Sequence, residues 1–161
     1  MDFVPEIIDG AVILNAVDVC NKGTDCRPCC ELAVGIHNWL VAHDINYLMV
    51  DFQDEKEVCT AILTELLQLN KRLDFPFIFC GLMDTPKQFL KSYLYYDHPV
   101  FEIPEDGVVY LKKAKPESLM VDLSGIREGE AIPCTRSRHY KSEGTEVEET
   151  ENQETAEAAE A

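Results

Sequence analysis

The stretch Tyr47–Leu73 constrains the fold more than any other part of the chain. It opens with the apolar run Tyr47–Val50, and a charged connection at Gln53–Glu57 follows. An apolar run bounded by charge is typical of a strand in a parallel sheet whose two faces are both covered. Apolar residues then recur at the spacing of one helical face, namely Ile62, Leu66, Leu69 and Leu73. The stretch therefore predicts a buried strand, a turn and an amphipathic helix.

The same strand–turn–helix unit recurs on both sides of this stretch. Asp9-Gly10 predicts a hairpin turn between the first two strands, and Pro86 fits the first turn of a helix that follows a core strand. The expected strands are Phe3–Ile8, Ala11–Val19, Pro76–Cys80, Val100–Ile103 and Val108–Leu111. Strands that alternate with helices predict an α/β fold. We expect a mainly parallel or mixed sheet of four to six strands flanked by helices.

Length and patterning predict one folded domain with an extension. At 161 residues the chain is long enough for a single core. We assign residues 1–112 to the domain and 113–140 to an irregular arm or an edge strand, for which Leu119–Leu123 is the candidate. Residues 141–161 carry many glutamates and almost no large apolar side chain, so a disordered acidic tail is expected.

The charge of the chain narrows its classes of partner. With 30 acidic and 14 basic residues the formal charge is −16, which disfavours nucleic acid and anionic lipid surfaces. No apolar run approaches the ~20 residues that a membrane helix needs, so membrane insertion is not expected. The first residues show neither the basic nor the apolar segment of a signal peptide. A cytoplasmic location is the corresponding expectation.

The order of the expected elements resembles the STAS family, the anti-sigma-factor antagonist domains. The resemblance covers roughly Ile7–Leu111 and is carried by the stretches YLMVDF, VCTAILTELLQL and PFIFCGLMDTPKQFLKSYL. It implies a STAS-like fold and a non-catalytic, bacterial signalling domain that regulates by binding another protein, without cofactor or metal. The implied partner is a kinase-like anti-sigma factor or another STAS protein, and self-association into a homo-oligomer stays open.

The resemblance also points to a docking surface and a modification site. The family's Asp-Ser-Ser-Gly motif, whose first serine is phosphorylated, falls here on Cys59-Thr60-Ala61-Ile62, and Asp51 matches the family's acidic residue. Thr60 is therefore the phospho-acceptor candidate, although only the hydroxyl of the motif is kept. The alternative is that Thr60 simply helps to start its helix. The docking candidates are Gln53, Asp54, Glu55, Val58, Cys59, Thr60, Asp84 and Thr85.

A second hypothesis concerns the cysteine-rich segment CNKGTDCRPCC. Its thiols are Cys20, Cys26, Cys29 and Cys30. A C-x2-C pair is half of a common zinc site, but no second half follows downstream. At a helix start the same pair suits a redox role, in which the helix dipole and Arg27 favour the thiolate. The remaining alternative is that these are small, partly buried loop residues.

Catalysis is not supported by the remaining motifs. The four histidines share no local triad pattern with a serine, cysteine or acid. The glycines form neither of the common phosphate-binding loops. We therefore expect a protein that is not an enzyme.

Overall fold

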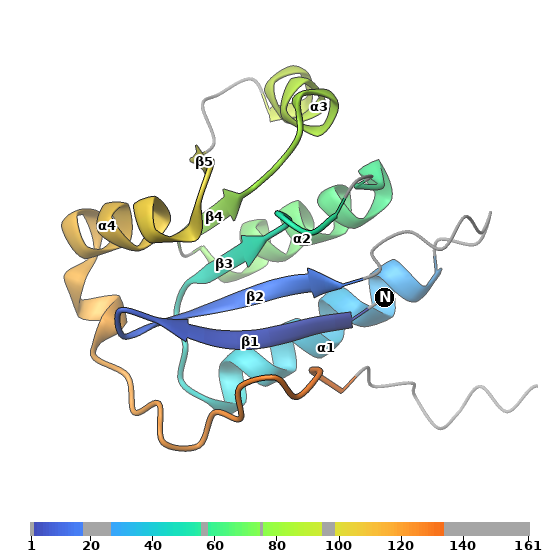
Figure 1. The fold of residues 1–161 in the computed structure, drawn as a ribbon. Coiled ribbons are helices and arrows are strands. Elements are labelled where there is room, and N and C mark those ends of the chain that lie inside the picture. The colour runs from blue at the N-terminus through green and yellow to red at the C-terminus, as the bar shows by residue number, and fades with distance from the viewer. Residues whose placement is uncertain (1, 18–26, 56–57, 75, 95–98, 134–161) are drawn as a thin grey trace, which may run out of the picture.

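The computed structural model describes residues 2–17, 27–55, 58–74, 76–94 and 99–133, and shows an α/β fold (Figure 1). Its sheet has five strands in the order β1-β2-β3-β4-β5. They are β1 (Asp2–Ile8), β2 (Ala11–Val17), β3 (Leu48–Asp51), β4 (Phe77–Cys80) and β5 (Val100–Phe101). β1 is antiparallel to β2, and every other neighbouring pair is parallel. The expectation of a mixed α/β sheet of four to six strands is confirmed.

Four α-helices are present in the described part of the chain. They are α1 (Arg27–Ala42), α2 (Thr60–Leu73), α3 (Asp84–Leu94) and α4 (Pro104–Ala114). α1, α2 and α3 each connect one strand to the next parallel strand, as the sequence pattern predicts. The expected helix over Ile62–Leu73 is confirmed, and Ile62, Leu66 and Leu69 are buried.

The first two strands form the expected hairpin. Ile8 pairs with Ala11, so Asp9 and Gly10 are the two residues of the turn. Both have positive φ, 49° at Asp9 and 80° at Gly10. A two-residue turn with positive φ at both positions matches the right-handed twist of the strands it joins.

The central strands are buried on both faces by helices. Every residue of β3 and of β4 is buried, as expected for strands of a covered parallel sheet. α1 and α2 pack against each other and lie behind the sheet in Figure 1. α4 lies on the opposite face, where Gly107 approaches Met49, Ile78 and Cys80. We call this second surface the α4 face.

The segment Val108–Leu111 was expected as a strand, and that prediction is wrong. It lies inside α4, and Val108 and Leu111 are both fully buried. The helix begins with Pro104, which costs no hydrogen bond in the first turn. Acids occupy its first turn and lysines its last, both favourable to the helix dipole. Gly107 lets α4 approach the sheet closely: a Cβ there would lie 3.2 Å from the Cys80 sulfur.

Residues 116–133 form an arm that returns along the outer edge of β1. The Gly129 amide donates to the Pro5 carbonyl at 3.1 Å, and the Ile132 amide donates to the Phe3 carbonyl at 2.8 Å. A covered edge does not offer its free backbone groups to another chain. Pro5 suits this edge because it has no N–H to leave unpaired.

The two alternatives for Leu119–Leu123 are resolved by this arm. Leu119 ends a short 3₁₀ helix over Pro116–Leu119, and the following residues have no strand structure. Leu119, Val121 and Leu123 are partly buried against the core. The segment is therefore a docked arm and not an edge strand. The predicted acidic tail at 141–161 lies outside the described residues.

Tyr47 provides a test of the buried sheet. Its hydroxyl accepts a hydrogen bond from the Val12 amide at 2.7 Å, and the side chain is 1% exposed. Tyr47→Phe would leave that buried amide without a partner, and we expect it to lower the free energy of unfolding by about 1–3 kcal/mol. Chemical denaturation measures this change. Tyr110→Phe is the control, because Tyr110 is 39% exposed, and an equal loss in both variants would contradict the assignment.

Candidate functional site

The carboxyl ends of β3, β4 and β5 meet at one edge of the sheet, which we call the carboxyl edge. Its described residues are 52–55, 58–59, 81–83 and 102–103. The Phe52 amide donates to the Cys80 carbonyl at 3.0 Å, and the Gly81 amide donates to the Phe101 carbonyl at 2.9 Å. These bonds continue the sheet pairing one residue past β3 and β4. The first residues of the loops after these two strands are therefore hydrogen-bonded to the sheet.

Gly81 brings two of these loops into direct backbone contact. Its φ is +67°, and a Cβ there would lie 2.6 Å from the backbone nitrogen of Gln53 and 2.8 Å from its Cα. Backbone atoms cannot move aside as the end of a flexible side chain can. Only glycine therefore satisfies both the positive φ and the contact.

Gln53 ties the loop after β3 to the end of β5. Its amide donates to Oδ1 of Asp51 at 3.0 Å, and its side-chain Nε2 donates to the Glu102 carbonyl at 3.1 Å. Glu102 also forms an ion pair with Lys87 of α3 at 2.6 Å. Together these contacts link β3, β5 and α3 across the carboxyl edge.

The structure places the expected docking residues at or beside this edge. Asp54 is exposed and Glu55 half-buried in the turn after β3, and Val58 and Cys59 are half-buried just before α2. Thr60 is the first residue of α2 and is exposed, and its carbonyl accepts from the Thr64 hydroxyl at 2.8 Å. Asp84 and Thr85 are exposed at the start of α3. The contacts that join the loops run through Gln53, which was among the candidates, and not through Thr60.

Two exposed apolar side chains at the edge were not named among the docking candidates. Met83 is 56% exposed in the loop after β4, and Ile103 is 42% exposed between β5 and α4. Both side chains add exposed apolar surface to the carboxyl edge. No local pattern distinguishes them from core residues, because their exposure depends on where the loops end.

A row of polar side chains crosses the α4 face just inside this edge. Asn15 pairs with Asp51, and Asp51 pairs with Cys80, so the three lie side by side on neighbouring strands. Asn15 Nδ2 donates to Glu6 of β1 at 2.7 Å, which extends the row to a fourth strand. Glu6 and Asn15 are functional candidates that the sequence did not single out.

Asp51 is the unusual member of this row. It is 9% exposed, and burial raises its pKa, while the hydrogen bond from the Gln53 amide acts in the opposite direction. The negative charges of Asp54, Glu6 and Glu105 raise the pKa of Asp51 further. A buried carboxylate among other acids disfavours its own ionised form, which is uncommon away from functional sites.

Cys80 lies beside Asp51 but is not a reactive thiol. Burial and the neighbouring acids, Asp51 first among them, raise the pKa of Cys80 to about 12. The thiolate is the nucleophile and the metal ligand, so Cys80 stays in its unreactive form near neutral pH.

The cysteine hypothesis is only partly covered by the structure. Cys20 and Cys26 lie outside the described residues, and Cys30 lies in α1. Cys29 is 7% exposed and belongs to the hydrophobic core. Among the described residues, no three side chains of His, Cys, Asp or Glu gather in a way that could hold a metal ion. The redox and metal alternatives for this segment stay predictions.

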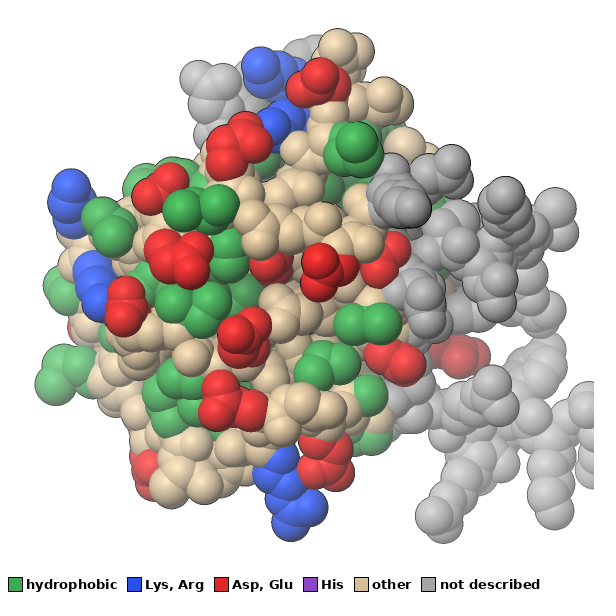
Figure 2. Space-filling view, viewed as in Figure 1, with side chains coloured by type: hydrophobic (Ala, Val, Ile, Leu, Met, Phe, Trp, Pro, Cys, Tyr) green, Lys and Arg blue, Asp and Glu red, His purple; other side chains and the backbone are tan. Residues whose placement is uncertain are grey.

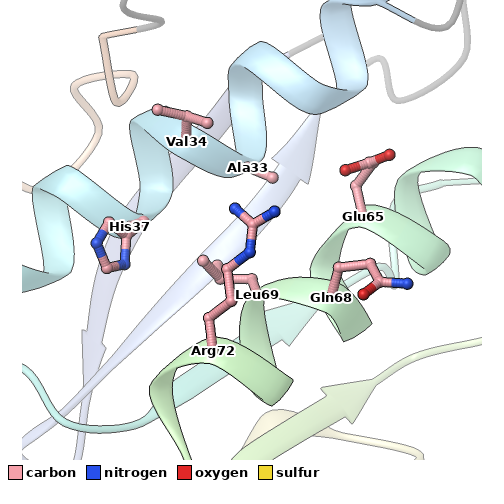
Figure 3. A pocket seen from close by; sticks show the side chains of 7 residues that line it. All are labelled: Ala33, Val34, His37, Glu65, Gln68, Leu69 and Arg72. Carbon is pink, nitrogen blue, oxygen red and sulfur yellow. The ribbon is translucent and has the colours of Figure 1, made fainter.

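A shallow hollow lies between α1 and α2 (Figure 3). Its lining is Ala33, Val34, His37, Glu65, Gln68, Leu69 and Arg72, and its volume is about 160 Å³. Nδ1 of His37 is buried there and has no hydrogen-bond partner among the described residues. Binding sites for small organic ligands commonly measure ~300–1,000 Å³, so this hollow is too small for most of them.

Comparisons with known proteins returned no match to a family, a curated protein or a solved structure. Within the described ranges, no helix is both long enough and apolar enough to span a bilayer.

Gly81→Ala tests the backbone contact with Gln53. Gly10→Ala is a matched control, since Gly10 also has positive φ but nothing lies within 4 Å of its Cβ position. We expect Gly10→Ala to cost about 1–2 kcal/mol of unfolding free energy from backbone strain alone. Gly81→Ala should cost about 1–3 kcal/mol more because of the clash. Equal losses of unfolding free energy in the two variants, measured by denaturant unfolding, would show that the contact between Gly81 and Gln53 does not restrict the residue at position 81.

Asp51→Asn tests the electrostatic cost of the buried carboxylate. The native state binds the Asp51 proton more tightly than the unfolded chain, in which the aspartate pKa has its ordinary value of 3.8. Asp51 therefore lowers stability as pH rises above that value. We expect Asp51→Asn to raise Tm at pH 7, and the gain to shrink as pH falls toward 4. An exposed control, Glu117→Gln, should change Tm little, and a loss of stability in Asp51→Asn at pH 7 would refute the electrostatic cost assigned to Asp51.

Proposed function

We propose that this domain is a non-catalytic regulatory module that binds another protein through its carboxyl edge. The observation that carries the proposal is the exposure of Met83 and Ile103 beside a loop that Gly81 and Gln53 hold in place. Such a surface offers apolar contact area without ordering a flexible loop on binding, which lowers the entropic cost of association.

The order of elements supports a STAS-like regulator. From β1 to β5 the chain runs hairpin, helix, strand, helix, strand, helix, strand, which is the order on which the resemblance rests. A kinase-like anti-sigma factor or another STAS protein is the partner that this resemblance favours. The last residues of α4 and the arm lie beyond Leu111, where the resemblance ends.

Thr60 is the residue at which we propose that binding is regulated. It is exposed as the first residue of α2, where the positive end of the helix dipole favours a phosphate. Phosphorylation would add a charge of about −2 to an edge that already carries Asp54 and Asp84. The partner's affinity would then change through charge alone.

Site-specific photo-crosslinking tests the proposed docking edge. A photoreactive amino acid is placed at Met83, at Ile103, or at Val41 as the control. Val41 is 59% exposed near the end of α1, so it matches the others in exposure. We expect the same protein to be captured from the native cell at Met83 and Ile103 but not at Val41, and Met83→Asp to reduce capture at Ile103.

Two results would contradict the proposal. Capture of the same proteins at Val41 with equal yield would show that crosslinking depends only on the solvent exposure of the labelled position. If the folded chain captures no protein at Met83 or at Ile103, the proposed docking edge is refuted.

A further inference from the structure

Within the described part of the chain, the helices leave part of the α4 face uncovered. α4 lies over Met49, Ile78 and Cys80, and it also contacts β1. Toward the carboxyl end of β2, Asn15 is half-buried and Val17 is 41% exposed. In Figure 1, α4 covers one end of the sheet, and the carboxyl half of β2 extends away from it. We call the uncovered region the open face; it comprises Asp2, Val4, Glu6, Asn15 and Val17, and the buried Asp51 lies at its border with α4.

The open face is acidic and is bordered by further acids. Asp2 and Glu6 are exposed on β1, and Asp51 is influenced by the charges of Glu6, Asp54 and Glu105. Figure 2 shows this side of the molecule, with acidic side chains spread across its middle and basic ones at its rim.

No cation within the described part of the chain neutralises this group of acids. The ion pairs that the structure shows there are Lys87–Glu102 and Arg127–Glu130, and neither includes Glu6, Asp51 or Asp54. Asp51 accepts a hydrogen bond from the Gln53 amide at 3.0 Å, which is a neutral donor. A buried carboxylate without a cation is costly, and a positively charged partner would reduce that cost.

The geometry points to a basic amphipathic helix of a partner protein as the ligand of the open face. A helix beside α4, at the usual separation of ~8–10 Å, would complete the second helical layer of the domain. Its apolar stripe would cover Val17 and Val4, and its lysines or arginines would reach Glu6 and Asp54. This inference rests on the proposed function, because the open face adjoins the carboxyl edge, and it adds the chemistry of the partner.

Charge distinguishes this ligand from the other candidates. A second copy of the chain would place acid against acid, since each copy carries a formal charge of −16. The glutamate-rich residues 141–161 would be repelled for the same reason. Nucleic acid and anionic lipid carry negative charge as well. A cationic protein segment remains as the complementary ligand.

The test uses the full chain and a synthetic lysine–leucine amphipathic peptide of about 18 residues, a length that can form a helix on binding. The double variant Glu6→Gln/Asp54→Asn removes two charges at or beside the open face. The matched control Glu117→Gln/Asp122→Asn removes two exposed charges elsewhere. Calorimetry should give a Kd about tenfold weaker for the first variant than for the control, and binding should weaken as salt is raised.

A second pair of variants tests the apolar contact. Val17→Asn and Val41→Asn both replace an exposed valine, 41% and 59% exposed. Only Val17→Asn should weaken binding. A peptide with the same lysines and a scrambled apolar stripe should bind less tightly than the amphipathic one.

Equal affinity of the peptide for the two double variants would overturn the inference, because it would show that the peptide is attracted only by the net charge of the chain. Absence of binding, or occupation of the open face by a second copy in solution, would also overturn it. The proposed function has its own readout in the crosslinks at Met83 and Ile103. Crosslinks at the edge without peptide binding would refute the basic helix alone, whereas loss of the crosslinks would refute the docking edge itself.

Discussion

The contact between Gly81 and the backbone of Gln53 organises the carboxyl edge of this molecule. Because a Cβ at Gly81 would lie 2.6 Å from the Gln53 nitrogen, the two loops meet at a separation that only glycine permits. This approach places Gln53 where its amide bonds Asp51 and its side chain reaches the Glu102 carbonyl. The lack of a Cβ at Gly81 thus allows the contacts of Gln53 that connect the ends of β3, β4 and β5.

The layering of the fold explains why a face remains available. α1 and α2 pack together on one side of the sheet, and α4 lies on the other. One helix cannot cover the whole of that face, so the carboxyl half of β2 stays accessible at Val17. Asp51 lies at the boundary between α4 and this accessible region. Burial and the neighbouring acids raise the pKa of Asp51, so its ionised form carries an electrostatic cost at this position.

The sequence predicted the central part of the fold because two periodicities are clear in it. The buried run at Leu48–Asp51 and the helical stripe of α2 follow directly from the positions of apolar residues. The error at Val108–Leu111 arose because a short apolar run has no period of its own. Pro104, with acids after it and lysines at the other end, was the available signal for a helix.

The site was less predictable than the fold, for physical reasons. The loop 53–55 and the starts of α2 and α3 were placed correctly, since in parallel α/β units they follow the strand ends. Met83 and Ile103 resemble core residues in the sequence, and only the tertiary structure shows them exposed. Glu6 and Asp51 lie more than 40 positions apart in the sequence, and the β2 pairings bring them onto one face.

Amide hydrogen exchange at the carboxyl edge tests the central claim most directly, because that claim is a docking surface fixed before any partner binds. The amides of Phe52, Gln53 and Gly81 all donate hydrogen bonds in the structure. We predict that these three amides are protected to nearly the same degree as the core amides of β3 and β4. If they exchange as fast as amides in unstructured peptides, the edge is not preorganised, and a docking surface fixed by Gly81 and Gln53 is contradicted.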